Sequence, residues 1–346
     1  MPADSDDRCA TEQPVADRLF AVAEGVYRVA LPTSFAVGDV NAYFIDGPRP
    51  ALIDCGVAGK PTLQCLAQAL GHIGRSIADI RILLLSHTHV DHAGSANAVR
   101  AQSGAEILLH PRGHERLSDI HADAERSAAW YSAFFGRAGF SADVIARHAA
   151  VSTKLERYAE SCPVLGRCVE GDEIDLGASR RIVVHESFGH TTNHLSYWLE
   201  DARLLFTGDH VLQHISPNPT LEPPGGSDRD KPLPLVLYQE SLERLGRLPA
   251  RLACPGHGTP FAGLGARATD IRAHQRRRCQ QVLEMLHESG GMTLKELSLA
   301  LFGSVPLWEI YLTVSEAHAA VELLESEGSV RRSTLEGIDR FAAIEP

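Results

Sequence analysis

Short apolar runs alternate along this chain with longer segments in which apolar residues recur at helical spacing. The short runs are bounded by glycine, proline or polar residues, which predicts strands at 26–30, 42–45, 51–53, 82–85, 106–109, 181–185, 203–206 and 252–254, and further short strands within 164–176. Helical spacing predicts helices at 63–73, 93–103 and 233–248, the first ending at Gly74. Strands that alternate with helices in this way indicate an α/β fold.

Two segments depart from this alternation. Residues 113–162 form a long insert that reads as mostly helical, with an aromatic helix face made by Trp130, Tyr131, Phe134 and Phe135. We expect most of these rings to pack the insert onto the body, and the insert as a whole to be a lid over the site or a dimer contact. The proline-rich segment 214–234 should border the site at its start and have a mobile tip at 225–231, and Tyr238 after it should pack within a helix.

The composition becomes helix-rich near residue 265. A long helix at 266–288 is followed by a second that begins at the N-cap Thr293, with Glu296 closing a capping box. A third helix is predicted at 315–327, and two strands at 330–332 and 338–342. We therefore divide the chain into a disordered tail (1–16), a main domain (17–265) and a C-terminal domain (266–346).

The candidate chemistry begins directly after the predicted strand 82–85. His87, His89, Asp91 and His92 place three imidazoles and a carboxylate within six residues. Neutral imidazole and carboxylate are ligands for zinc, and also for iron or manganese. A polar loop with chance histidines is the alternative, but it leaves the downstream partners of this cluster unexplained.

Those partners follow later strands. His190, Asp209 and His257 each lie just past a predicted strand, and each follows a glycine. A glycine permits the backbone angles of a tight loop. We expect these loops to converge with the first cluster at one end of a sheet system.

Together these residues resemble the metallo-β-lactamase superfamily. The resemblance implies an αββα sandwich in which His87, His89 and His190 hold one metal ion. It further implies that Asp91, His92 and His257 hold a second, that Asp209 bridges the two, and that Asp54 hydrogen-bonds a ligand histidine from behind. Phe188 stands where relatives usually carry proline. The pattern after residue 265 resembles the winged-helix domain of lactamase-beta-like proteins, which are related to glyoxalase II-like enzymes.

The resemblance also implies an activity. Two divalent ions, zinc before iron or manganese, would provide a bridging hydroxide, and Asp91 would ligate a metal and shuttle a proton. We expect hydrolysis of a thioester or carboxylic ester of a small or medium organic substrate. The alternative is a phosphodiesterase or endoribonuclease, which needs a basic groove from residues such as Arg112, Arg116, Arg126, Arg137 and Lys154. A metal-stabilised regulator that binds through the winged helix is disfavoured by the complete ligand set.

Charge and composition limit the partners. The net charge is −11, and residues 267–346 carry nine Arg or Lys against twelve Asp or Glu. The helix at 315–327 has four glutamates and no lysine or arginine, so it would repel a nucleic-acid backbone. We expect a small-molecule substrate rather than nucleic acid, with a homodimer kept as an alternative. Without an apolar leader, a membrane-length run or a paired-cysteine motif among its seven cysteines, the sequence favours a soluble cytoplasmic enzyme with free thiols.

Overall fold

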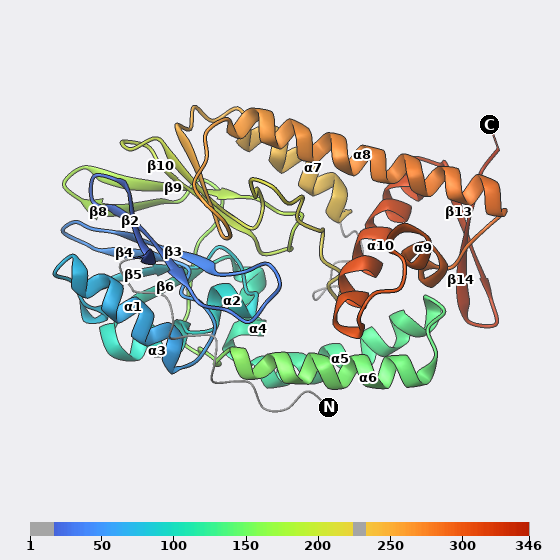
Figure 1. Cartoon of the computed structure of the whole chain (residues 1–346), viewed down its shortest axis with the longest axis horizontal. Coiled ribbons are helices and arrows are strands. Elements are labelled where there is room, and N and C mark those ends of the chain that lie inside the picture. Colours follow the sequence, from blue (N-terminus) through green and yellow to red (C-terminus); the bar gives the residue numbers. More distant parts are fainter. Residues whose placement is uncertain (1–16, 224–232, 346) are drawn as a thin grey trace.

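The computed structural model describes residues 17–223 and 233–345. The predicted tail at 1–16 and the predicted mobile tip at 225–231 lie outside these residues. The α/β prediction is confirmed, because two sheets lie face to face with helices on their outer sides (Figure 1).

The first sheet has seven strands in sequential order. They are β1 (Leu19–Ala23), β2 (Val26–Leu31), β3 (Val40–Ile45), β4 (Ala51–Ile53), β5 (Ile82–Leu84), β6 (Glu106–Leu109) and β7 (Gly166–Arg167). Strands β1 to β4 pair antiparallel, and β4 to β7 pair parallel. Helices α1 (Lys60–His72) and α3 (Ala96–Ser103) bury apolar residues such as Leu66 and Val99 against the outer face. Burial of those apolar faces holds the layer in place.

The second sheet has five strands in the order β12 (Leu252–Pro255), β11 (Leu204–Gly208), β10 (Leu195–Leu199), β9 (Arg180–Glu186) and β8 (Glu173–Gly177). Its inner face meets the first sheet in a core that includes Tyr43, Leu84 and Phe206. Helices α7 (Pro234–Leu245) and α8 (Leu264–Ser289) cover its outer face through Leu242 and Ile271. The layers are therefore helix, sheet, sheet and helix.

The insert is helical, as predicted. It holds the short helices η3 (Pro111–Gly113) and α4 (His114–Ser118), the antiparallel pair α5 (Ile120–Arg137) and α6 (Ala142–Leu155), and η4 (Glu156–Tyr158). In Figure 1 this pair runs along one side of the molecule toward the C-terminal elements, and α8 reaches the same elements along the opposite side.

The C-terminal elements and the insert share one hydrophobic core. After α8 come α9 (Leu294–Phe302), η5 (Leu307–Glu309), α10 (Ile310–Ser326) and the hairpin β13 (Val330–Leu335) and β14 (Ile338–Ala343). Phe134 and Phe135 of α5 pack in one cluster with residues of all three helices and the hairpin. Nine of the seventeen residues of α10 are buried, so this helix is central to the core rather than a surface helix. A winged-helix architecture for these elements stays a prediction.

Several elements differ from their predicted form. Strands β1 and β10 were not predicted. The predicted helix at 93–103 is instead two helices, α2 (Val90–Ala93) and α3. The 3₁₀ turn η2 (Ile77–Asp79) lies farther upstream, before β5. Gly94 lies between α2 and α3 and packs closely against the carbonyl oxygen of Tyr158, since a Cβ there would lie 2.3 Å from that oxygen. The third C-terminal helix begins at Ile310 rather than Ser315.

Two further observations concern the described residues. Their six cysteines are all unpaired and buried, as predicted for free thiols. No single helix there is long and apolar enough to cross a bilayer. The pair Leu294–Phe302 and Leu307–Ser326, bent by 114°, meets the criterion of length and composition only jointly.

Candidate metal centre

The candidate ligands arrive on loops at one end of the two sheets. His87, His89, Asp91 and His92 follow β5, where α2 begins. The other three follow strands of the second sheet, and the structure brings all seven together: His190 after β9, Asp209 after β11 and His257 after β12.

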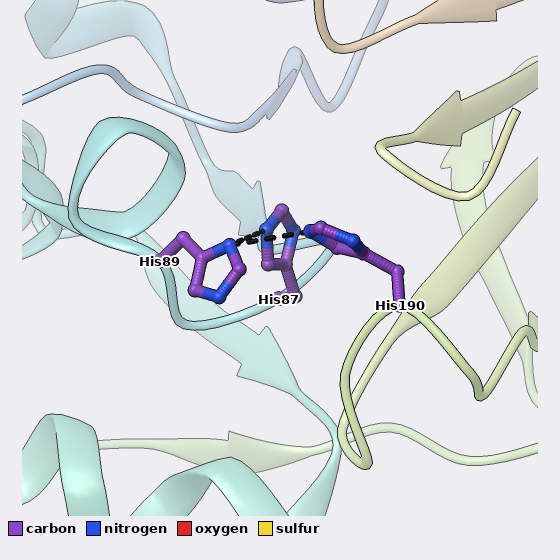
Figure 2. Close-up of side chains that lie close together, drawn as sticks. All are labelled: His87, His89 and His190. Atoms are coloured by element: carbon purple, nitrogen blue, oxygen red, sulfur yellow. Dashed lines mark hydrogen bonds between the residues drawn. The ribbon is translucent and has the colours of Figure 1, made fainter. Parts of the chain in front are cut away.

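The first group consists of His87, His89 and His190. Figure 2 shows their rings pointing toward one another. His89 Nδ1 lies 2.9 Å from His87 Nε2 and 3.3 Å from His190 Nε2. Three ring nitrogens that converge at this distance are a donor set for one metal ion.

The second group consists of Asp91, His92 and His257, with Asp209 between the two groups. His257 Nε2 lies 3.3 Å from Asp91 Oδ2 and 3.6 Å from Asp209 Oδ2. Asp209 also reaches back to the first group, because its Oδ2 lies 3.8 Å from His190 Nε2. The Oδ1 of Asp209 is 3.4 Å from His92 Nε2. One carboxylate therefore faces donors of both groups.

Unpartnered polar atoms at the centre of these groups fit metal ions. Within the described residues, His92 Nε2, His257 Nε2 and Asp209 Oδ1 are buried and make no hydrogen bond. Buried polar atoms are normally paired, so each such atom needs an explanation. These three atoms belong to imidazole and carboxylate groups, and metal ligation accounts for their lack of hydrogen bonds.

The hydrogen bonds behind the rings set their tautomers. His190 Nδ1 lies 2.8 Å from the carbonyl oxygen of Asn218, and His257 Nδ1 lies 2.9 Å from that of Asp39. A carbonyl only accepts, so each Nδ1 carries the hydrogen. In the neutral ring, Nε2 then presents its lone pair to the centre, as metal binding requires.

Asp54 sets the tautomers of His92 and His87 from the end of β4. Its carboxylate accepts from the Ser86 amide (2.7 Å), the Ser86 hydroxyl (2.7 Å) and His92 Nδ1 (2.8 Å). Because the Ser86 hydroxyl donates to Asp54, it accepts from His87 Nδ1 at 3.0 Å. The backbone of Asp54 is left-handed, with φ of 57°. Such strain in a residue other than glycine is typical of functional sites.

Three residues of the first sheet hold the turn that carries His257. The Asn41 side chain donates to the carbonyls of Pro255 and Gly258, and the Tyr43 hydroxyl donates to that of Pro255. The buried Arg28 donates to the Gly258 carbonyl at 2.5 Å. The ligand motif gives no indication of these three side chains, and sequence reasoning missed all of them.

Sequence reasoning also missed His194. This buried ring accepts from the Asp209 amide through Nε2 (3.1 Å) and contacts the Ser187 hydroxyl through Nδ1 (2.7 Å). It fixes the backbone of Asp209 and does not join the donor groups. The signal that could have found it is the apolar run 195–199, which marks a strand directly after it. Tyr238 packs within α7 as predicted, and its hydroxyl donates to the His210 carbonyl.

Gly256 permits the close approach of two ligands. A Cβ at this position would lie 2.4 Å from Asp209 Oδ1 and 2.6 Å from His92 Cε1. Both distances are shorter than any ordinary contact, so a side chain here would displace a donor.

The two groups differ in their electrostatics. Burial, together with neighbouring histidines, lowers the pKa of His87 well below its ordinary value and that of His89 to about 3. Burial also acts to lower the pKa of His92 and His257, but the adjacent carboxylates, Asp209 above all, raise it overall. The first group therefore presents neutral nitrogens, and the second pairs rings with carboxylates.

The sequence profile of the metallo-β-lactamase superfamily matches residues 36–257, which include every candidate ligand and Asp54. The chain belongs to the metallo-β-lactamase superfamily. This membership confirms the predicted family, and with the buried His/Asp groups it places the chain among the metallo-hydrolases of the superfamily.

Similar proteins extend the likeness beyond the profile. The chain is 32% identical over 312 residues to the probable metallo-hydrolase YqjP of Bacillus subtilis, covering 89% of this chain and 94% of that protein. It is 29% identical over 289 residues to the atrochrysone carboxyl ACP thioesterase of Aspergillus fumigatus, covering 80% of this chain and 72% of that protein. The metallo-β-lactamase family protein TTHA1429 of Thermus thermophilus has a similar structure, with a TM-score of 0.76, 28% identity, and coverage of 94% of this chain and 100% of that chain.

Proposed function

We propose that this chain is a dinuclear metal-dependent hydrolase that cleaves a thioester or carboxylic ester of a small or medium organic substrate. The observation that carries the proposal is the position of Asp209. Its Oδ2 lies within 3.8 Å of Nε2 of His190 in the first group and within 3.6 Å of Nε2 of His257 in the second. A carboxylate shared between two donor sets is the arrangement that holds two ions side by side.

The donors define what would be held. His87, His89 and His190 would hold one divalent ion, Asp91, His92 and His257 the other, and Asp209 both. Imidazole and carboxylate suit zinc first, and iron or manganese as alternatives. When bound, two such ions supply Lewis acidity toward a substrate oxygen and activate water for attack.

Asp91 would move the proton. Burial acts to raise the pKa of this carboxyl, but the rings of His92 and His257 lower it overall, so it is a carboxylate at neutral pH. Its Oδ2 faces His257 Nε2 at the centre of the site. There it can accept the proton of the attacking water and return it to the departing sulfur or oxygen as the acyl bond breaks. Water and a thioester then become a carboxylic acid and a thiol, and water and an ester become a carboxylic acid and an alcohol.

Two observations support an ester or thioester over RNA. The similar protein from Aspergillus fumigatus is named as a thioesterase. The cations that an RNA groove would need are partly neutralised by carboxylates: Arg126 pairs with Glu115 and Asp123, and Arg137 pairs with Asp339. A small-molecule substrate, rather than nucleic acid, therefore forms part of the proposal.

Metal content and hydrolysis measured on one sample test the proposal. The panel contains acyl-CoA and acyl-glutathione thioesters, an aryl ester, a lactone and single-stranded RNA. We expect about two metal ions per chain and turnover of a thioester or ester that falls by at least about 100-fold in Asp91→Asn. Asp143→Asn on the exposed face of α6 is the matched control. Cleavage of RNA alone, or two bound metals without turnover of any ester, contradicts the proposed substrate class.

A further inference from the structure

The segment 218–222 lies between the metal centre and the core shared by the insert and the C-terminal elements. On the metal side it holds His190 through three hydrogen bonds. The Asn218 carbonyl accepts from His190 Nδ1 at 2.8 Å. The Thr220 amide and hydroxyl both donate to the His190 carbonyl, at 2.9 Å and 2.5 Å. The position of His190, backbone and ring, therefore follows the position of this segment.

On its other side the same segment is held by two tyrosines from distant parts of the chain. The carbonyl oxygen of Leu221 accepts from the hydroxyl of Tyr131 at 3.1 Å and from that of Tyr311 at 2.6 Å. Tyr131 belongs to α5 of the insert, and Tyr311 belongs to α10. A carbonyl has two lone pairs, so both hydroxyls can donate to it at once.

Further contacts hold the segment on the α10 side. The Leu221 amide donates to Ser315 Oγ at 3.2 Å, and the Asn218 side chain donates to the Leu312 carbonyl at 3.0 Å. The Leu221 side chain is itself part of the shared core. The segment is thus built into this core at one face and into the metal centre at the other.

The two hydroxyls stay protonated donors across the physiological range. Burial raises the pKa of Tyr131 to about 12 and that of Tyr311 well above its ordinary value. Buried hydroxyls that lose their acceptor, and a buried carbonyl that loses its donors, are costly. The bonds to Leu221 are therefore costly to lose, and the two adjacent hydroxyls also interact with each other.

We propose that Tyr131 and Tyr311 are positioning residues that fix Leu221, and through segment 218–222 set His190 for its metal ion. The insert and the C-terminal elements then serve the first donor group directly, although they contribute no ligand. This inference rests on the role of His190 in the proposed function. It assigns to the C-terminal elements a task that requires no nucleic acid.

Variants that remove the two tyrosine hydroxyls, singly and together, test whether these hydroxyls position Leu221. In Tyr131→Phe or Tyr311→Phe the Leu221 carbonyl keeps one donor, so zinc affinity should fall by less than about threefold. In the double variant it loses both, and one of the two zinc ions should bind about tenfold more weakly while the other keeps its affinity. The double effect should exceed the product of the single effects, because the two donors share one acceptor.

The measurement is zinc affinity of the full chain by chelator competition, with thermal unfolding recorded on the same samples. The absorption spectrum of the cobalt-substituted protein reports ligand geometry and should change in the double variant. Tyr27→Phe is the control, because this partly buried tyrosine of β2 packs on the core of the first sheet and not on segment 218–222. Thr220→Val, which removes a donor to the His190 carbonyl, is the second variant and decides the question if the double variant does not fold.

Unchanged affinity for both ions, with only a lower unfolding temperature in the double variant, overturns the inference, as does an unchanged affinity in Thr220→Val. Failure of the proposed function is seen separately. A wild-type protein that binds two zinc ions and hydrolyses none of the esters contradicts the activity. It leaves the affinity comparison valid.

Discussion

Asp54→Asn should weaken metal binding without unfolding the protein. The asparagine can lie in the cavity in two ways. If its oxygen takes the bond from the Ser86 amide, its NH₂ faces His92 Nδ1 and the Ser86 hydroxyl, at positions now 2.8 Å and 2.7 Å from the carboxylate. A donor there favours the His92 tautomer with hydrogen on Nε2. Through the Ser86 hydroxyl it does the same to His87. Neither Nε2 can then bind a metal ion.

The other orientation keeps the tautomers and sets the NH₂ against the Ser86 amide. Two buried donors then face each other, which leaves an unsatisfied group at a cost of about 1–3 kcal/mol. At a pH where His92 is neutral, the metal-free protein avoids this cost by adopting the first orientation, whereas the metal-bound protein does not. We therefore expect nearly unchanged stability without metal, and dissociation constants for zinc raised by about 10- to 100-fold.

Chelator competition with zinc and urea unfolding of the metal-free protein measure the two expectations. Asp79→Asn is the control, because Asp79 also accepts from a serine amide and hydroxyl, those of Ser76, but at an exposed turn. Wild-type affinity for both ions in Asp54→Asn would refute the tautomer argument. A large loss of stability in the metal-free variant would show that Asp54 acts on the fold instead.

Three further predictions concern other parts of the molecule. His257→Ala should release one of two metal ions and abolish most turnover, which metal analysis checks; two retained ions with full activity contradict its assignment. Gly256→Ala should clearly reduce the metal content and change the unfolding temperature only slightly, since its Cβ would lie 2.4 Å from Asp209 Oδ1 and displace this ligand. Burial acts to raise the pKa of Glu170, but hydrogen bonds and Arg244 hold it below its ordinary value of 4.5. Its stabilisation is therefore present above that pH and is lost as the pH falls below it. The gap in stability between wild type and Glu170→Gln should narrow as the pH falls below 4.5, and a gap in urea unfolding that does not narrow counts against the prediction.

The sequence predicts the loops that carry the candidate ligands because their imidazole and carboxylate groups are clustered and directly follow recognisable strands. The strand β10 was missed, although all five of its residues are buried. The polar Ser196 interrupts its apolar run, whereas the uninterrupted run of β5, equally buried, was predicted. His194, directly before this strand, was missed as well. Its role depends on the hydrogen bond that it accepts from the Asp209 amide.

Other parts of the site could not be predicted from side-chain patterns. The acceptors behind His190 and His257 are backbone carbonyls of Asn218 and Asp39, and every residue has a carbonyl. The aromatic spacing on α5 predicts a packed face. Phe134 and Phe135 are buried there and Trp130 is half-buried, in a core shared with the C-terminal elements. The pattern does not show what covers it, because any apolar surface satisfies such a face. Only the folded chain pairs it with elements some 150–200 positions later.

That shared core bears on how proteins of this architecture can be divided and recombined. A cut before α8 removes most of the partners of Phe134 and Phe135 and exposes much of the aromatic face of α5 to water. The C-terminal elements, taken alone, lose the other half of the same core. A functional module here is therefore discontinuous along the chain. Natural or engineered exchange would have to carry the insert, segment 218–222 and the C-terminal elements together, as one cassette.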